Sequence, residues 1–126
     1  MSPFGSLLRY YRNERGIPPK ELAAELGVSD KKISAIEIGR RRPPDEKDLA
    51  RICKYLSLTE AESAALYEAA QLSHPHVRIP DNATPREYRL VHHFVRALGH
   101  LSDNQINVIH KTLNQRAGLR EGGDMT

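Results

Sequence analysis

The stretch 19–38 most constrains what this chain can fold into. Its aliphatic residues recur at helical spacing on both sides of Gly27, which predicts two short helices, 19–26 and 30–38, with a tight turn between them. Two helices that cross this closely need a small residue at the crossing, and Ala23 supplies it. The turn needs a backbone that tolerates positive φ, which a glycine provides.

The second of these helices is expected to have an inward and an outward face. Ile33 and Ile36 lie about one turn apart and fix the helix to a core. Ser29 is placed to accept a hydrogen bond as the N-cap, and the carboxylate that follows it suits the positive end of the helix dipole. At helical spacing the outward face then carries Asp30, Lys31, Ser34, Ala35 and Ile38.

Three further helices are predicted within residues 1–72. Residues 4–15 repeat apolar side chains at i, i+3, i+4 and i+7 and are followed by Gly16, a residue typical of helix C-termini. A helix capped by an aspartate follows over 45–56, and a capping box opens another over 59–72. We therefore expect this part of the chain to be a five-helix, all-α domain.

The composition changes after the fifth helix. The segment 73–83 contains two prolines and no helical period, which indicates a linker. Capping boxes at Thr84 and Ser102 each precede apolar residues at helical spacing, so we expect a C-terminal αα-hairpin over 84–117. Residues 118–126 are expected to form a disordered tail.

Composition favours a cytoplasmic protein without membrane segments. With 126 residues, the chain is one small domain or one domain with an appendage. No apolar run approaches the roughly 18 residues of a spanning helix, and the N-terminus lacks the apolar segment of a signal peptide. The single cysteine, Cys53, lies at core spacing and cannot form an internal disulfide, so we expect a buried, unreactive thiol in a reducing compartment.

The residue types that support catalysis or metal binding are not arranged for either task. His92 and His93 are adjacent and do not share a helix face, and no cysteine or acidic cluster accompanies them. The other histidines are His74, His76, His100 and His110. No nucleophile–base pair, glycine-rich phosphate loop or pair of carboxylates stands out. We therefore expect no enzyme, no cofactor and no metal, and histidines on the surface or at an interface.

The net charge is only +3, but the basic residues are concentrated. Between residues 31 and 42 one acid, Glu37, stands against a group of bases. These bases are Lys31, Lys32, Arg40, Arg41 and Arg42. A local basic patch on a nearly balanced domain indicates a surface that binds DNA, and a merely solvated charged face is the alternative.

The segment Phe4–Leu72 resembles the lambda-repressor-like, or XRE-type, helix-turn-helix family of prokaryotic and phage transcription regulators. The residues that carry the resemblance are Leu8, Arg12, Gly16, Ile17, Leu22, Ala23, Leu26, Gly27, Val28, Ser29, Ile33, Ile36, Glu37, Gly39 and Pro43. The resemblance implies a DNA-binding domain whose third helix enters the major groove of double-stranded DNA. It also implies that Arg12 pairs with Glu37, which agrees with the rule that a half-buried carboxylate requires a partner.

The resemblance further implies which side chains contact DNA. Bases would be read by Asp30, Lys31, Ser34 and Ala35. Lysine and serine donate to base edges, alanine can meet a thymine methyl, and aspartate can accept from cytosine. The DNA backbone would be contacted by Ser29, Lys20, Lys32, Arg40, Arg41 and Arg42. For Lys32 a solvated side chain is an equal alternative.

One position departs from the family pattern. The family usually has a glutamine at the start of the second helix, where it holds a phosphate. Here that position is Pro19, which has no side-chain donor and no N–H. The amide or the side chain of Lys20 is the expected substitute. Without it, the arginine turn must bind more of the phosphates.

Two functions from different classes fit these features. The first is a sequence-specific transcription regulator, a repressor that binds a palindromic operator as a homodimer. The hairpin 84–117 would form the dimer contact, unless it folds back on the first five helices. The second is an antitoxin that neutralises a partner toxin and autoregulates its operon. A ligand-sensing regulator is a weaker third hypothesis, because about 40 residues make a poor small-molecule pocket.

Overall fold

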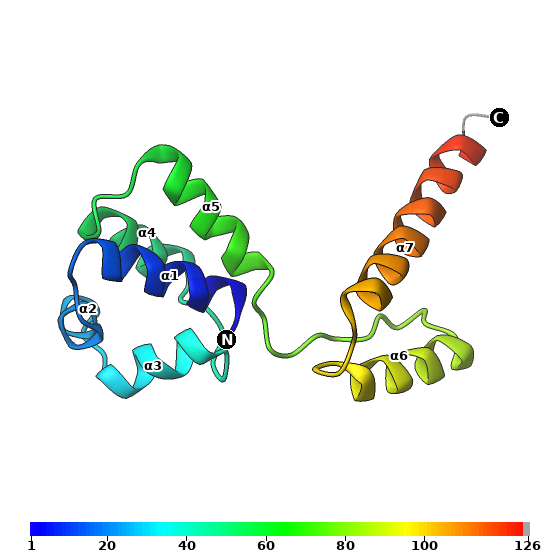
Figure 1. The fold of residues 1–126 in the computed structure, drawn as a ribbon, viewed down its shortest axis with the longest axis horizontal. Coiled ribbons are helices and arrows are strands. Elements are labelled where there is room, and N and C mark those ends of the chain that lie inside the picture. Colours follow the sequence, from blue (N-terminus) through cyan, green and yellow to red (C-terminus); the bar gives the residue numbers. More distant parts are fainter. Residues whose placement is uncertain (125–126) are drawn as a thin grey trace. The chain divides into compact units, whose positions relative to one another are not determined.

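The computed structural model describes the backbone of residues 1–124 and the side chains of residues 1–115. Its helices are α1 (Pro3–Glu14), α2 (Pro19–Leu26), α3 (Asp30–Ile38), α4 (Glu46–Tyr55), α5 (Glu60–Gln71), α6 (Pro85–Ala97) and α7 (Asp103–Asp124). No strand occurs in this part of the chain, and the predicted all-α fold class is confirmed. The chain divides into two compact units, Met1–Arg78 with α1 to α5 and Ile79–Thr126 with α6 and α7 (Figure 1).

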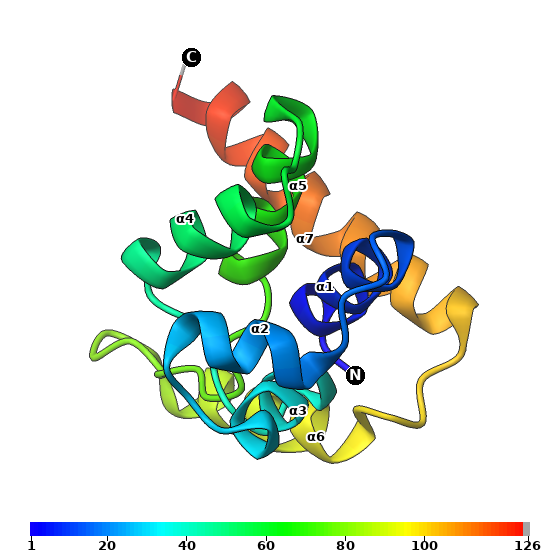
Figure 2. The ribbon, with the colours of Figure 1, turned by 90° about the vertical axis from the view of Figure 1, so that its left-hand side faces the viewer.

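In the first unit, α3 packs against α1 and α2. The helix α1 also packs against α5, and α2 packs against α4. Figure 2 shows α3 along one edge of this unit, with α4 and α5 on the opposite side. One face of α3 is therefore buried by its neighbours, while the other is left at the surface.

The ends of α3 are fixed by local chemistry. The turn before it contains Gly27 at φ 70°, and the turn after it contains Gly39 at φ 89°, a left-handed backbone that strains residues with side chains. The hydroxyl oxygen of Ser29 accepts a hydrogen bond from the amide of Lys32 at 3.2 Å and so caps the helix. The bounds of α3 agree with those expected from the sequence.

The core of the first unit draws one large apolar side chain or more from each of its helices. The most deeply buried ones are Phe4, Leu8, Leu22, Ile33, Ile52, Leu56 and Leu66. Burying a side chain of this size contributes about 1.5–3 kcal/mol, so this cluster supplies most of the driving force for folding. Cys53 is half-buried and packs against the same cluster.

The helices α1 and α3 approach each other closely at Gly5. Gly5 is buried there, and a Cβ atom built on it would lie 1.8 Å from the carbonyl oxygen of Glu37. About two turns further along α1, the Arg12 guanidinium donates from Nε to Glu37 Oε2 at 3.0 Å and from a terminal nitrogen to Oε1 at 3.2 Å. Both side chains of this ion pair are buried. The pair expected from the sequence is thus present, and it holds the last turn of α3.

The helix α5 is tied to α1 near both of its ends. Ser73 is buried, accepts a hydrogen bond from the amide of Phe4 at 2.9 Å and donates to the carbonyl of Ala69 at 2.6 Å. At the other end, Arg15 donates to Glu62 Oε1 at 2.9 Å. A backbone N–H from the N-cap of α5 and the Arg15 guanidinium hold the pKa of Glu62 below its ordinary value. We expected Ser73 in the linker 73–83, but it packs inside the first unit.

The second unit is a pair of helices with a shared apolar groove and little buried surface. Capping boxes begin both helices, as expected: Glu87 accepts from the amide of Thr84 at 2.8 Å, and Gln105 accepts from the amide of Ser102 at 2.9 Å. No side chain of α6 is buried. A hairpin of this kind leaves apolar surface that a further partner can cover.

The helix α7 is longer than the sequence indicated. We expected it to end before Gly118, whereas it continues to Asp124. A glycine inside a helix lowers stability by only about 1 kcal/mol relative to alanine, so a single glycine does not have to end one. The expected disordered tail, 118–126, thus overlaps α7, and its last two residues lie outside the described part of the chain.

Within the described residues, no helix is long and apolar enough to cross a membrane.

Replacing Glu37 with alanine tests the buried ion pair. The substitution leaves the Arg12 guanidinium buried without its partner, and we expect the free energy of unfolding to fall by about 3–5 kcal/mol. Urea denaturation followed by circular dichroism measures this change. As a control, alanine at the exposed Glu68 should change stability by no more than about 0.5 kcal/mol. Equal losses in the two variants would contradict the structural role of the pair.

Replacing Gly5 with alanine tests the close approach of α1 and α3. Because the new methyl group would overlap the Glu37 carbonyl, α1 must move, and we expect a loss of about 1–3 kcal/mol or more. Alanine at the neighbouring, exposed Ser6 is the matched control and should leave stability nearly unchanged. The same denaturation assay compares the two variants. A Gly5 variant as stable as the Ser6 variant would show that the two helices can separate freely here.

Candidate nucleic-acid interface

The outward face of α3 lies opposite its buried residues. Ile33, Ile36 and Glu37 are buried on the inward side. At about 100° per residue, Lys31 lies nearly opposite their centre, with Ser34 and Ala35 on either side of it. Lys31 and Ser34 are exposed, and Ala35 is half-buried. A narrow polar strip therefore runs along the surface of the helix.

Asp30 and Ile38 lie at the two ends of this strip. Asp30 is exposed in the first turn, close to the edge that leads to the buried Glu37. Ile38 is 45% exposed in the last turn, on the same face as Lys31. Ile38 thus lies on the same face as residues for which the family resemblance implies base contacts.

The basic turn follows α3 directly. The amides of Arg40 and Arg41 both donate to the carbonyl of Ala35, at 2.9 and 3.3 Å, so the chain folds back over the end of the helix. The side chains of Arg40, Arg41 and Arg42 are exposed, and the buried Pro43 ends the turn. Cations beside a helix C-terminus are favoured by the helix dipole. The three exposed arginines thus directly follow α3 in the chain, and Arg41 and Arg42 line a pocket together with Lys32 and Asp48.

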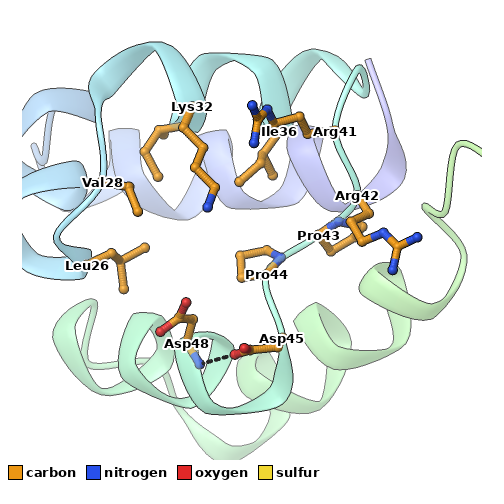
Figure 3. Close-up of a pocket in the computed structure, with 11 residues that line it drawn as sticks. Leu26, Val28, Lys32, Ile36, Arg41, Arg42, Pro43, Pro44, Asp45 and Asp48 are labelled. Atoms are coloured by element: carbon orange, nitrogen blue, oxygen red, sulfur yellow. Dashed lines mark hydrogen bonds between the residues drawn. The ribbon is translucent and has the colours of Figure 1, made fainter.

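Lys32 is directed elsewhere. Figure 3 shows its side chain pointing into a pocket between α3 and α4, toward the side where Asp48 lies. The carboxylates of Asp45 and Asp48 line this pocket together with Leu26 and Pro44. Lys32 remains exposed, so a phosphate contact and a solvated side chain both stay open for it.

Ser29 and Lys20 lie at the N-terminal ends of α3 and α2. The Ser29 oxygen is used as a cap, but its exposed hydroxyl retains a proton that can be donated. No side chain caps α2, whose first residue is Pro19. Lys20 is exposed in the first turn, where the amides of a helix have no partner within it. Both residues keep the donors that a phosphate contact requires.

No group of three or more histidine, cysteine, aspartate or glutamate side chains suited to a metal ion occurs within the described residues.

Comparison with known proteins agrees with this geometry. A family model described as a helix-turn-helix domain matches residues 3–66, which include α1 to α4 and the first half of α5. No curated protein and no solved structure matches the chain. The match confirms the resemblance inferred from the spacing of Ala23, Gly27 and the inward isoleucines. The chain belongs to the helix-turn-helix domain family.

Proposed function

We propose that this protein is a sequence-specific transcription regulator that binds double-stranded DNA as a homodimer and acts as a repressor in the cytoplasm. One observation carries the proposal. The helix α3 of a helix-turn-helix domain presents exposed Lys31 and Ser34 on the side opposite its buried residues, directly before a turn of three exposed arginines. A helix that is anchored on one side and polar on the other suits the major groove.

Each outward side chain of α3 has a base contact that fits its chemistry. The Lys31 ammonium can donate to guanine O6 or N7, and the Ser34 hydroxyl can reach several base edges. Ala35 presents a methyl group for thymine, and Asp30 can accept from the amino group of cytosine. Arg40, Arg41 and Arg42 then hold phosphates and position the helix without reading sequence, aided by Ser29 and Lys20.

The buried ion pair supports this role because it fixes α3 on the side that faces the core. Glu37 lies in the last turn of α3 and is fixed by Arg12 of α1, so the helix is held at both its core face and its C-terminal end. A recognition element discriminates between bases only when its side chains are held in place by their surroundings. Arg12 and Glu37 are therefore assigned to the scaffold and not to DNA contact.

Dimerisation follows from the small size of the reading surface. A single short helix offers few base contacts, so useful specificity requires two copies on a palindromic site, with half-site centres about one DNA turn apart. The second unit supplies a candidate contact, since Phe94, Leu98, Ile109 and Leu113 line an apolar groove between α6 and α7. A dimer bound across an operator would exclude other proteins from the same DNA.

An antitoxin is a second candidate, favoured by the same apolar groove. A surface lined by Phe94, Leu98 and Ile106 can be covered by another protein instead of a second copy. In that case the isolated chain would be monomeric. It would form a dimer, or its second unit would become ordered, only when the toxin is bound. The oligomeric state of the purified chain separates the two candidates.

A selection of binding sites from random duplex DNA tests the proposed function, and two variants sharpen it. The wild-type protein should recover a palindromic motif at moderate salt. Lys31→Ala should relax the preference at one base position per half-site, because it removes a base contact worth about 1–3 kcal/mol. Arg41→Ala should weaken binding to all sites alike and flatten the dependence of affinity on salt.

The two variants serve as controls for each other. Both remove one exposed positive charge from neighbouring segments, so a change in net charge cannot explain different outcomes. Recovery of no palindrome by the wild type would refute the proposed regulator. Equal loss of specificity in both variants would show that the outward face of α3 does not face the bases.

Replacing Phe94 with glutamate tests the dimer contact in the full-length chain. The charge enters the apolar groove, so we expect a shift from dimer to monomer in analytical ultracentrifugation and weaker binding to the palindrome. Val108→Glu is the matched control, because this side chain is 55% exposed on α7 but does not line the groove. If the Phe94 variant remains as dimeric as the Val108 variant, the groove is not the dimer contact.

A further inference from the structure

The polar side of α6 carries only bases. At about 100° per residue, five residues of this helix fall within one arc of roughly 120°. They are Arg86, Arg89, His92, His93 and Arg96, and all of them are exposed. We call this set the α6 basic stripe. The stripe is independent of the basic turn after α3, which belongs to the other unit.

No acid interrupts the stripe. Glu87 is the one acidic residue of α6, and it lies on another side of the helix, where its carboxylate accepts the amide of Thr84 in the capping box. Within the described residues, none of the three arginines forms an ion pair. Their positive charge is therefore directed at the solvent. Arg86 and Arg89 also line one shallow hollow, together with Thr84, Glu87 and Leu90, so the carboxylate lies at the edge of the stripe near Arg86 and not within it.

The other side of α6 lines an apolar groove. Phe94 and Leu98 line the groove toward α7, together with Ile109 and Leu113. The apolar side and the basic stripe lie on opposite sides of the same helix. A protein that covers the groove would consequently leave the stripe free to bind a second molecule.

We propose that the α6 basic stripe binds the phosphate backbone of DNA and forms a second, sequence-independent contact in addition to that of the helix-turn-helix domain. Arginine is always charged, and its planar fork matches the geometry of phosphate oxygens, while histidine N–H groups can donate to the same oxygens. Arg89 and Arg96 are two turns apart, about 10 Å along the helix, and so reach separate phosphates.

The proposal rests on the proposed function, because DNA already held by the first unit is present near α6 at a high effective concentration. An amphipathic basic helix can also lie on an anionic lipid surface. That mode requires the apolar side of the helix to enter the acyl chains, whereas in this structure Phe94 and Leu98 face the groove shared with α7. The arrangement favours DNA.

Salt-dependent binding of the full-length protein to duplex DNA tests the proposal. The double variant Arg89→Gln/Arg96→Gln removes two phosphate contacts, so the slope of log affinity against log salt should decrease by about 2 for each protomer bound. Arg89→Lys/Arg96→Lys keeps the charges and should retain most of the wild-type slope. Lys54→Gln/Lys111→Gln removes two exposed charges outside the stripe and should leave the slope unchanged. Circular dichroism verifies that the variants remain folded.

The outcomes separate this inference from the proposed function. An unchanged slope in the glutamine variant, or an equal decrease in the control, overturns the inference. Because phosphate contacts do not depend on sequence, the slope can be measured on any duplex, even if the wild type selects no palindrome. Binding to phosphatidylserine vesicles that is lost in the glutamine variant, with an unchanged DNA slope, would assign the stripe to lipid instead.

Discussion

The contact between α1 and α3 at Glu37 is the constraint on which the DNA-binding surface depends. The backbone of Glu37 meets α1 where Gly5 leaves no room for a side chain, and its carboxylate is held by Arg12. Steric exclusion thus sets how near the two helices come, and the ion pair sets how α3 is rotated. A buried pair of this kind adds little to stability over an apolar pair, but it has one geometry, which suits a helix whose outward side chains must be placed accurately.

The two faces of α3 differ in their contribution to the fold. Ile33 and Ile36 join the core, so the helix cannot turn without exposing apolar surface. Lys31 and Ser34 on the other side make no contact that folding requires. The left-handed Gly39 ends α3 at this strip, and three exposed arginines follow it in the chain.

The second unit follows a different principle. It lacks a buried side chain in α6, so its structure presents surfaces instead of enclosing a core. One side of α6 lines an apolar groove, and the other is uniformly basic. Hydrophobic contact in the groove is non-directional and does not discriminate strongly between apolar partners. The arginines of the stripe, in contrast, favour anionic groups such as phosphates. This unit follows the linker after Ser73. Under the two proposals it would both dimerise the protein and add a second contact to the same DNA.

The sequence by itself determined those features that depend on neighbours a few residues away. Capping by Ser29, Thr84 and Ser102, the left-handed turn at Gly27, and the helical repeat of aliphatics are local, and they predicted the bounds of α3 and the helix-turn-helix family, whereas the predicted end of α7 was wrong. The tertiary structure alone decided the contacts between distant segments. Gly5 matters because a carbonyl of α3 lies against it, and Ser73 belongs to the first unit because the amide of Phe4, 69 residues away, donates to it. Lys32 likewise lines a pocket together with Asp48 of α4, a neighbour that helical spacing within α3 cannot reveal.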